Sequence, residues 1–244
     1  QANIGQDDPR VAFTARTFAG TLFVTRDGQL VHSLHGKLLG ETERADAGPV
    51  RAGRKRDSGW ALTETLVGAR PVPRGAEPGP TRVSRFTANA RERGSSEVPT
   101  FERVSFGEAW PGIQVDIAAR GRNVEKIFTV APGADVRRIA VRMRGANRLA
   151  LAADGSLLAH TGNGPVSFTA PIAWQDIDGL RHPVKVAYAL SGHRYGFKVG
   201  PHDRAHPVVI DPLMGTTYLG GAADDGVNGM TITANGTLYV VGTT

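Results

Sequence analysis

Short segments in which apolar and polar residues alternate run along most of this chain, and glycine-containing turns separate them. In the clearest case, residues 21–25 and 29–34 flank the dipeptide Asp27-Gly28. Such a dipeptide between two alternating segments is typical of a tight β-hairpin, because glycine readily adopts the positive φ that the turn needs. The same pattern predicts five hairpins, over residues 21–34, 149–160, 172–190, 184–199 and 230–241.

Helical periodicity is weak throughout. Residues 131–143 show some helical spacing, but Pro132-Gly133 and the alternation over 139–143 favour a turn followed by a strand. No apolar run approaches the ~18 residues that a transmembrane helix needs. The sequence therefore predicts an all-β protein, a β-sandwich-like stack of hairpins without a membrane span.

Residues 41–100 interrupt this pattern. They are rich in Gly, Pro, Arg and Glu, and they include a proline-rich stretch over residues 70–80. We expect long loops here, with strands near 60–67 and 82–88.

Composition narrows the range of possible chemistry. Of 244 residues, 40% are hydrophobic, which is enough to bury a substantial core, and none is cysteine. The absence of cysteine excludes disulfides, thiolate catalysis and Cys-ligated zinc. Because the first residue is Gln1 rather than Met, we expect a processed chain from which a targeting segment has been removed.

Charge is distributed unevenly along the chain. All 29 basic residues and 20 of the 23 acidic residues lie in 1–204, a net of +9, whereas residues 205–244 carry three acids and no base, a net of −3. The densest basic run, Arg54-Lys55-Arg56, is followed at once by Asp57, as on a solvated surface. We therefore expect no nucleic-acid partner.

Motifs of known enzyme classes are missing from the sequence. It contains no phosphate-binding loop with its lysine, no His-Glu-x-x-His and no Gly-x-Ser-x-Gly. His202 and His206 are four residues apart, but Pro201 and Pro207 favour a surface loop there over a metal-binding helix. We predict no catalytic residue and a protein that is not an enzyme.

One pair of acidic residues suits a metal. Asp224 and Asp225 lie in a glycine-rich turn close to Asn228, and oxygen ligands of this kind suit calcium. The same carboxylates would also serve to accept hydrogen bonds from loop amides. Calcium is thus the one cofactor that stays open, and no other is expected.

Three tryptophans could stack on a ligand. Trp174 alternates with Ile172 in a predicted strand, and Trp110 precedes a Pro-Gly turn, so packing within the protein is the better interpretation for both. Trp60 lies in the irregular region and is the candidate for contact with a glycan.

Distinctive combinations of aromatic, Pro, Gly and Asp residues recur before residue 213, in Trp110–Asp116, Phe128–Asp135, Ala170–Gln175 and Val209–Pro212. Together with the opening residues 3–16, they resemble the N-terminal β-rich domain of large bacterial secreted and surface proteins. The resemblance implies a β-rich domain over residues 1–212, with 41–100 rich in loops. It also implies secretion, with an extracellular or cell-surface location after removal of a signal peptide.

The remaining residues resemble a different module. Thr217–Gly221, Asp224–Gly226 and Asn235–Thr244 are similar to one copy of the SBBP-type bacterial β-propeller repeat, which follows such domains in tandem. The resemblance implies a propeller-type β-hairpin repeat over residues 213–244. Neither resemblance implies a reaction.

A single repeat cannot bury its apolar face alone. We therefore predict that this hairpin adds as strands to a neighbouring copy, and that the protein is a non-enzymatic structural subunit of a surface layer or filament. The alternative is a glycan- or surface-binding head module of a larger β-propeller adhesin. The predicted interface residues are Met230, Ile232, Leu238, Val240 and Val241.

Overall fold

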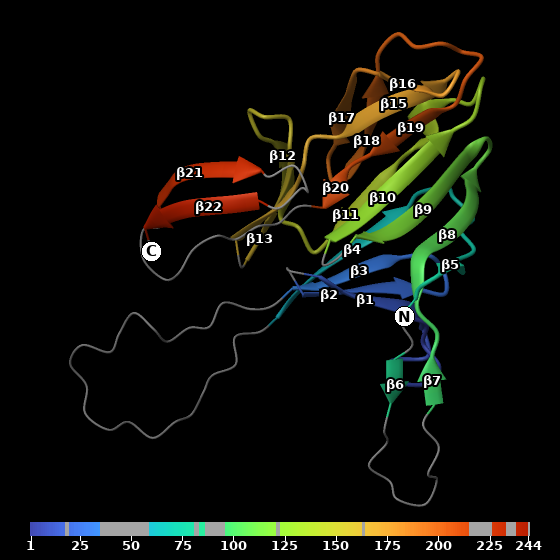
Figure 1. Ribbon diagram of the computed structural model, residues 1–244, viewed down its shortest axis with the longest axis vertical. Helices are drawn as coiled ribbons and strands as arrows, with labels where there is room; N and C mark the ends of the chain where they lie inside the picture. Colours follow the sequence, from blue (N-terminus) through green and yellow to red (C-terminus); the bar gives the residue numbers. More distant parts are fainter. Residues whose placement is uncertain are drawn as a thin grey trace, which may run out of the picture. The chain divides into compact units, whose positions relative to one another are not determined.

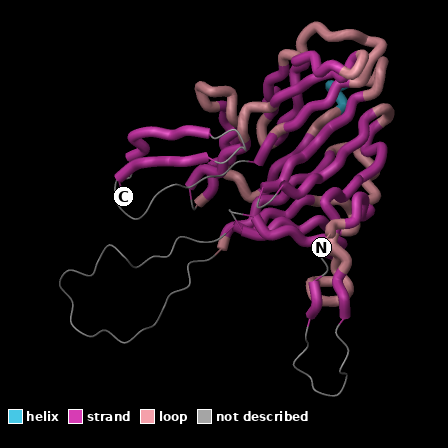
Figure 2. Tube along the Cα trace, viewed as in Figure 1, coloured by secondary structure: helices cyan, strands magenta, loops and turns pink. Residues whose placement is uncertain are grey.

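Antiparallel β-strands make up almost all of the regular structure. One short 3-10 helix, η1 (Val136–Arg138), is also present, and no helix among the described residues is long and apolar enough to cross a membrane (Figure 2). The predicted all-β class is confirmed. The computed structural model describes residues 1–17, 20–34, 59–80, 83–85, 96–120, 123–162, 164–214, 226–232 and 238–243.

The chain divides into two compact units. The first comprises residues 1–35 and 59–216, and the second comprises 36–58 and 217–244. The described strands form no closed barrel or propeller. The domain boundary expected after residue 212 stays a prediction.

A seven-stranded sheet draws on both halves of the first unit. Its strands β4 and β11 are neighbours, so that the strands before residue 67 pair directly with strands that follow residue 140 (Figure 1). In spatial order the sheet contains β1 (Val11–Thr17), β2 (Gly20–Thr25), β3 (Leu30–Leu34), β4 (Trp60–Leu66), β11 (Val141–Arg144), β18 (Arg194–Val199) and β17 (Val186–Ser191).

An eight-stranded sheet forms the other large layer. The late strand β19 inserts between β15 and β10, and β20 (Leu213–Met214) pairs with the first half of β10. In spatial order its other strands are β16 (Leu180–Pro183), β15 (Ile172–Ile177), β19 (Val208–Asp211), β10 (Asn123–Val130), β9 (Ile113–Arg120), β8 (Phe101–Trp110) and β5 (Arg74–Pro78).

Three smaller sheets complete the described strands. One has three strands, β12 (Arg148–Leu151), β13 (Leu157–Thr161) and β14 (Gly164–Phe168). The other two are the pairs β6 (Val83–Arg85) with β7 (Ser96–Val98), and β21 (Gly226–Ile232) with β22 (Leu238–Thr243).

Four of the five predicted hairpins are present: β2–β3, β12–β13, β17–β18 and β21–β22. The prediction for residues 172–190 was wrong in its second strand. After the turn at Asp178-Gly179, β15 pairs with the short β16, and residues 186–191 belong to the other large sheet. Pro183 ends the hairpin because proline has no amide hydrogen for the ladder, and the chain then crosses between the sheets.

The loop-rich region contains more regular structure than its composition indicates. Strand β4 lies where residues 60–67 predicted it, and β6 lies within the predicted 82–88. Strand β5 was missed, because Arg74-Gly-Ala-Glu-Pro78 has no apolar alternation to reveal it.

The core lies between the two large sheets. Along β10 every second side chain is buried, as expected for a strand with one face toward a core. Phe128 of β10 meets Phe197 of β18 across the layers, with ring centroids 5.3 Å apart, and Tyr188 of β17 stacks on Phe197. The inner faces of the two sheets therefore share one apolar cluster.

Truncation of Phe128, which is fully buried, tests this shared core. We expect Phe128→Ala to lower the free energy of unfolding by about 3–5 kcal/mol, because the lost ring leaves a cavity between the sheets. Ile172→Ala is the control, since its side chain is 60% exposed, and we expect a change within about 0.5 kcal/mol. Urea denaturation measures both values, and equal losses would contradict the shared core.

Candidate functional site

The hairpin β21–β22 carries the predicted interface positions. Its register places Met230 opposite Val240 and Ile232 opposite Leu238. Directly opposed positions of an antiparallel pair lie on one face, so these four positions share a face. Val241 pairs with Gly229 and therefore belongs to the other face. Their assignment to an interface stays a prediction.

The two strands of this hairpin pair only with each other among the described residues. Each strand therefore has one outer edge whose backbone groups meet no other described strand. Such an edge is a template for the addition of another strand. The register also shifts between Val227 and Gly229, a bulge that twists the start of β21.

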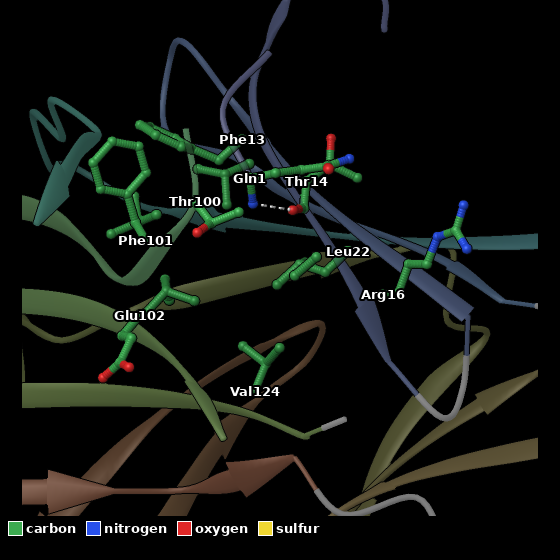
Figure 3. A pocket seen from close by; sticks show the side chains of 13 residues that line it. Gln1, Phe13, Thr14, Arg16, Leu22, Thr100, Phe101, Glu102 and Val124 are labelled. Carbon is green, nitrogen blue, oxygen red and sulfur yellow. Dashed lines mark hydrogen bonds between the residues drawn. The ribbon is translucent and has the colours of Figure 1, made fainter. Parts of the chain in front are cut away.

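A small cavity lies beside the edge strand β1 of the seven-stranded sheet. Its volume is about 260 Å³, and the apolar side chains of Phe13, Leu22 and Phe101 contribute to its lining (Figure 3). Main-chain hydrogen bonds of 2.9 Å in both directions join Gln1 to Thr14 of β1. The cavity is thus an apolar recess next to a sheet edge.

Trp60 is engaged within the protein. Its indole N–H donates a hydrogen bond of 2.6 Å to the carbonyl oxygen of Gly145, and its ring packs so closely on Gly162 that a Cβ there would lie 2.4 Å from a ring carbon. These contacts tie β4 to two turns. They give the indole a structural role, and glycan contact by Trp60 stays a prediction.

The other two tryptophans follow the packing interpretation. Trp110 is buried and donates a hydrogen bond of 2.9 Å to the carbonyl oxygen of Val67. Trp174 is half-buried within the β15–β16 hairpin, where the guanidinium of Arg181 lies 4.2 Å from the ring centroid. Neither ring is a bare stacking platform.

The predicted calcium ligands Asp224 and Asp225 lie outside the described residues. Within the part of the chain that the structure describes, no three His, Asp or Glu side chains are grouped to hold a metal. His202 and His206 lie in a loop, as their flanking prolines indicated, and His206 Nδ1 is 2.9 Å from Asp203 Oδ2.

The sequence analysis missed a buried polar cluster between the large sheets. Glu64 of β4 is its centre, and its carboxylate is contacted by His32 of β3, Lys126 of β10 and Tyr195 of β18. The His32 Nε2 to Glu64 Oε1 distance is 2.8 Å, and the Lys126 ammonium also donates to the Tyr195 hydroxyl. All four residues are buried.

The electrostatics of this cluster favour an ion pair. Burial alone raises the pKa of Glu64, but the positive charge of Lys126 and the hydrogen bond from His32 outweigh it, so the pKa lies below its ordinary value of 4.5. Burial and the nearby Glu64 charge raise the pKa of Tyr195 well above 10.0. The hydroxyl therefore stays protonated and donates to the carboxylate.

A carboxylate, a histidine, a lysine and a tyrosine are also the residue types of many catalytic sites. A catalytic group must reach its substrate, however, and the side chains of Glu64, His32 and Lys126 are only 0%, 4% and 6% exposed. Instead, the cluster lies buried in the core between the two large sheets. One sequence signal could have revealed this cluster. Glu64 and Lys126 are charged residues at inward-facing positions of strands whose other inward-facing residues are apolar.

Comparison with protein families places residues 1–213 within a single family, described as Domain of unknown function (DUF7948). The chain belongs to the DUF7948 family. No curated protein and no solved structure matches it. The DUF7948 match contains β1–β19 and the cluster around Glu64, and β21 and β22 follow it. The bacterial secreted proteins and the SBBP repeat of the sequence resemblance stay predictions.

Removal of one ionic partner from the DUF7948 core tests the role of the cluster. Glu64→Leu leaves the Lys126 charge buried and unpaired, and we expect a loss of about 3–5 kcal/mol in the free energy of unfolding. Glu64→Leu with Lys126→Met removes both charges, so the double variant should lose less than the single variant. Urea denaturation gives the cycle, and additive losses would show that the two residues are not coupled.

The lowered pKa of Glu64 also predicts a pH dependence. The unfolded state binds a proton to Glu64 near pH 4.5, whereas the folded state resists it to lower pH. The contribution of Glu64 to stability is therefore complete above that pH and is lost as the pH falls below it. Wild type should therefore lose stability relative to the double variant as the pH falls from neutral to acidic. A constant difference in denaturation at each pH would contradict this.

Proposed function

We propose that this protein is a non-enzymatic structural subunit that associates through β-strand addition by the hairpin β21–β22. We place it outside the cell or on the cell surface, after removal of a signal peptide, and we propose that the hairpin is a propeller-type SBBP repeat behind a sandwich-like body. The observation that carries the proposal is that β21 and β22 pair only with each other among the described residues.

A two-stranded sheet is at best marginally stable in water. The register places four apolar positions, Met230, Ile232, Leu238 and Val240, on one face of this sheet. A third strand along either edge would satisfy backbone hydrogen bonds, and contact with a partner would cover the apolar face. The unpaired backbone edges and the apolar face therefore both favour a partner that contributes a β-strand.

The body has a partly occupied sheet edge. Strand β1 ends the seven-stranded sheet, and residues 1–3 already pair with its outer edge from Ala12 to Thr14, so an added strand would have to pair beyond Thr14. An added strand continuing past Thr14 would bring a side chain to the cavity of about 260 Å³ beside β1. Because hairpin and edge are different surfaces, the contact is heterologous and is able to build an open filament.

Charge supports association between copies. Residues 1–204 carry a net of +9 and residues 205–244 a net of −3. A hairpin on the acidic segment would approach the basic body of a neighbour with favourable long-range attraction, which salt screens over about 8–10 Å. The association should therefore weaken as ionic strength rises.

The alternative is a glycan- or surface-binding head module of a larger β-propeller adhesin. It rests on Trp60, whose N–H donates to the carbonyl oxygen of Gly145 and whose ring packs against Gly162. Assembly has the stronger support, and we propose it first.

Electron microscopy and light scattering of the intact chain test the proposal. We expect filaments or large regular particles, and we expect deletion of residues 215–244 to give a folded monomer, because no described strand of the body pairs with β21 or β22. An oligomer that is unchanged after the deletion would refute assembly through the hairpin.

A matched pair of substitutions locates the contact on the hairpin. Val240→Asp puts a charge on the four-residue apolar face, whereas Tyr239→Asp puts it at the neighbouring position of the opposite face. We expect Val240→Asp to shift the particles to monomers and Tyr239→Asp to have a much smaller effect. Sedimentation velocity compares the two, and the reverse order would assign the contact to the other face.

A further inference from the structure

A second cavity opens at one end of the core shared by the large sheets. Its volume is about 500 Å³, within the range of about 300–1,000 Å³ typical of ligand sites. The end of β10, the end of β18 and the start of β19 supply an apolar floor, formed by Val130, Phe197, Val199 and Val208. These strand ends lie at the upper end of the body in Figure 1.

Two loops form the walls. Residues 131–137 follow β10 and include η1, and residues 200–207 join β18 to β19. Loops held at the end of a rigid β scaffold are a common location of binding residues.

The loop over residues 200–207 is hydrogen-bonded to a buried side-chain amide of the neighbouring strand β15. Gln175 of β15 is 2% exposed, and its side-chain nitrogen donates to the carbonyl oxygens of Asp203 and His206 at 2.7 and 2.9 Å. Its side-chain oxygen accepts from the Asp203 amide at 2.9 Å. A buried amide whose bonds all go to one loop fixes the backbone of that loop.

The loop over residues 131–137 is fixed as well. The Ala131 amide donates to the carbonyl oxygen of Gly112 at 2.8 Å, and Asp135 caps η1 by accepting from the Arg137 amide at 3.0 Å. Both walls are therefore held by hydrogen bonds within the protein.

The charges around the cavity are mostly positive. Lys198, Arg204 and Arg137 line it with two histidines, His202 and His206, and Asp135 is the one acid in the lining. Asp135 is paired with Arg137 at 2.9 Å, and the nearby Asp203 accepts from the Ala205 amide and contacts His206.

Two of these cations have no acidic partner in the described part of the chain. No carboxylate there lies within ion-pair distance of Lys198 or Arg204. The histidines are oriented too, since Nδ1 of His202 is 2.9 Å from the carbonyl oxygen of Gly200 and Nδ1 of His206 faces Asp203. The Nε2 atom of each ring makes no hydrogen bond to a described residue.

We propose that this cavity binds a small ring compound that bears a carboxylate, of the class of a uronic acid. Arg204 and Lys198 would hold the carboxylate, because a guanidinium matches its two oxygens. Pro132, Val136 and Val199, the lining residues that are exposed or half-buried, would pack against the C–H face of the ring. The site is independent of the assembly proposed above, because it uses no residue of β21 or β22.

NMR titration of the intact protein tests the site with three probes: glucuronate, glucose and inorganic phosphate. Glucuronate has both the ring and the anion, whereas each of the other two has only one of them. We expect saturable shifts at the two loops with glucuronate, and weaker binding of both other probes.

The double variant Lys198→Gln/Arg204→Gln removes the two unpaired cations from the rim, where both side chains are exposed. We expect at least about tenfold weaker glucuronate binding, as for the loss of charged hydrogen bonds. Arg148→Gln is the control, an exposed cation on β12 outside the cavity, and its affinity should stay within about twofold. Thermal unfolding verifies that all variants fold.

Three results would overturn the proposal. The first is the absence of saturable glucuronate binding to the wild type. The second is equal binding of glucuronate and either of the other probes, which would mean that the ring or the anion is not recognised. The third is an equal loss of affinity in the double variant and in Arg148→Gln, which would indicate attraction to the overall positive charge alone.

Discussion

The carboxylate of Glu64 is the point at which the two large sheets are joined. It belongs to β4 of one sheet, and Lys126 comes from β10 of the other. A charge this deeply buried is tolerated only when it is paired and hydrogen-bonded, so the two strands must face each other in one register. A one-residue slip of β10 would turn Lys126 away from the core and Glu125 into it. The register of the apolar partners, including Phe128 against Phe197, depends on this pairing.

Much of the strand structure could be predicted from local pattern. A glycine turn such as that at Gly28 predicts a hairpin from a few residues, because the turn itself requires the positive φ, here 77°. The order of strands in the sheets could not be predicted in the same way. That β11 lies beside β4, and that β17 leaves the sheet of β15, is decided by burial between distant segments, and no local pattern of residues 172–190 reveals it.

The candidate sites likewise divide into those that local sequence predicts and those that only the fold brings together. The apolar alternation of the last hairpin was visible in the sequence, and its backbone register agrees with it. The polar cluster and the basic cavity were not visible, because each gathers residues from strands or loops far apart in the chain. Trp60 shows the converse: its irregular surroundings made it the candidate for glycan contact, whereas the turns at Gly145 and Gly162 come from other parts of the fold and contact it.

The interleaved strand order also has a consequence for how the chain acquires its fold. Tyr195 is 131 residues from the carboxylate it contacts, and β19 must insert between strands that are already far apart in the chain. No N-terminal portion is able to complete either large sheet alone. A growing chain would therefore hold Glu64 without its last partner, Tyr195, until nearly the whole first unit has been made. Folding should then be a late, concerted event, on the timescale of about milliseconds to seconds that non-local β pairing imposes.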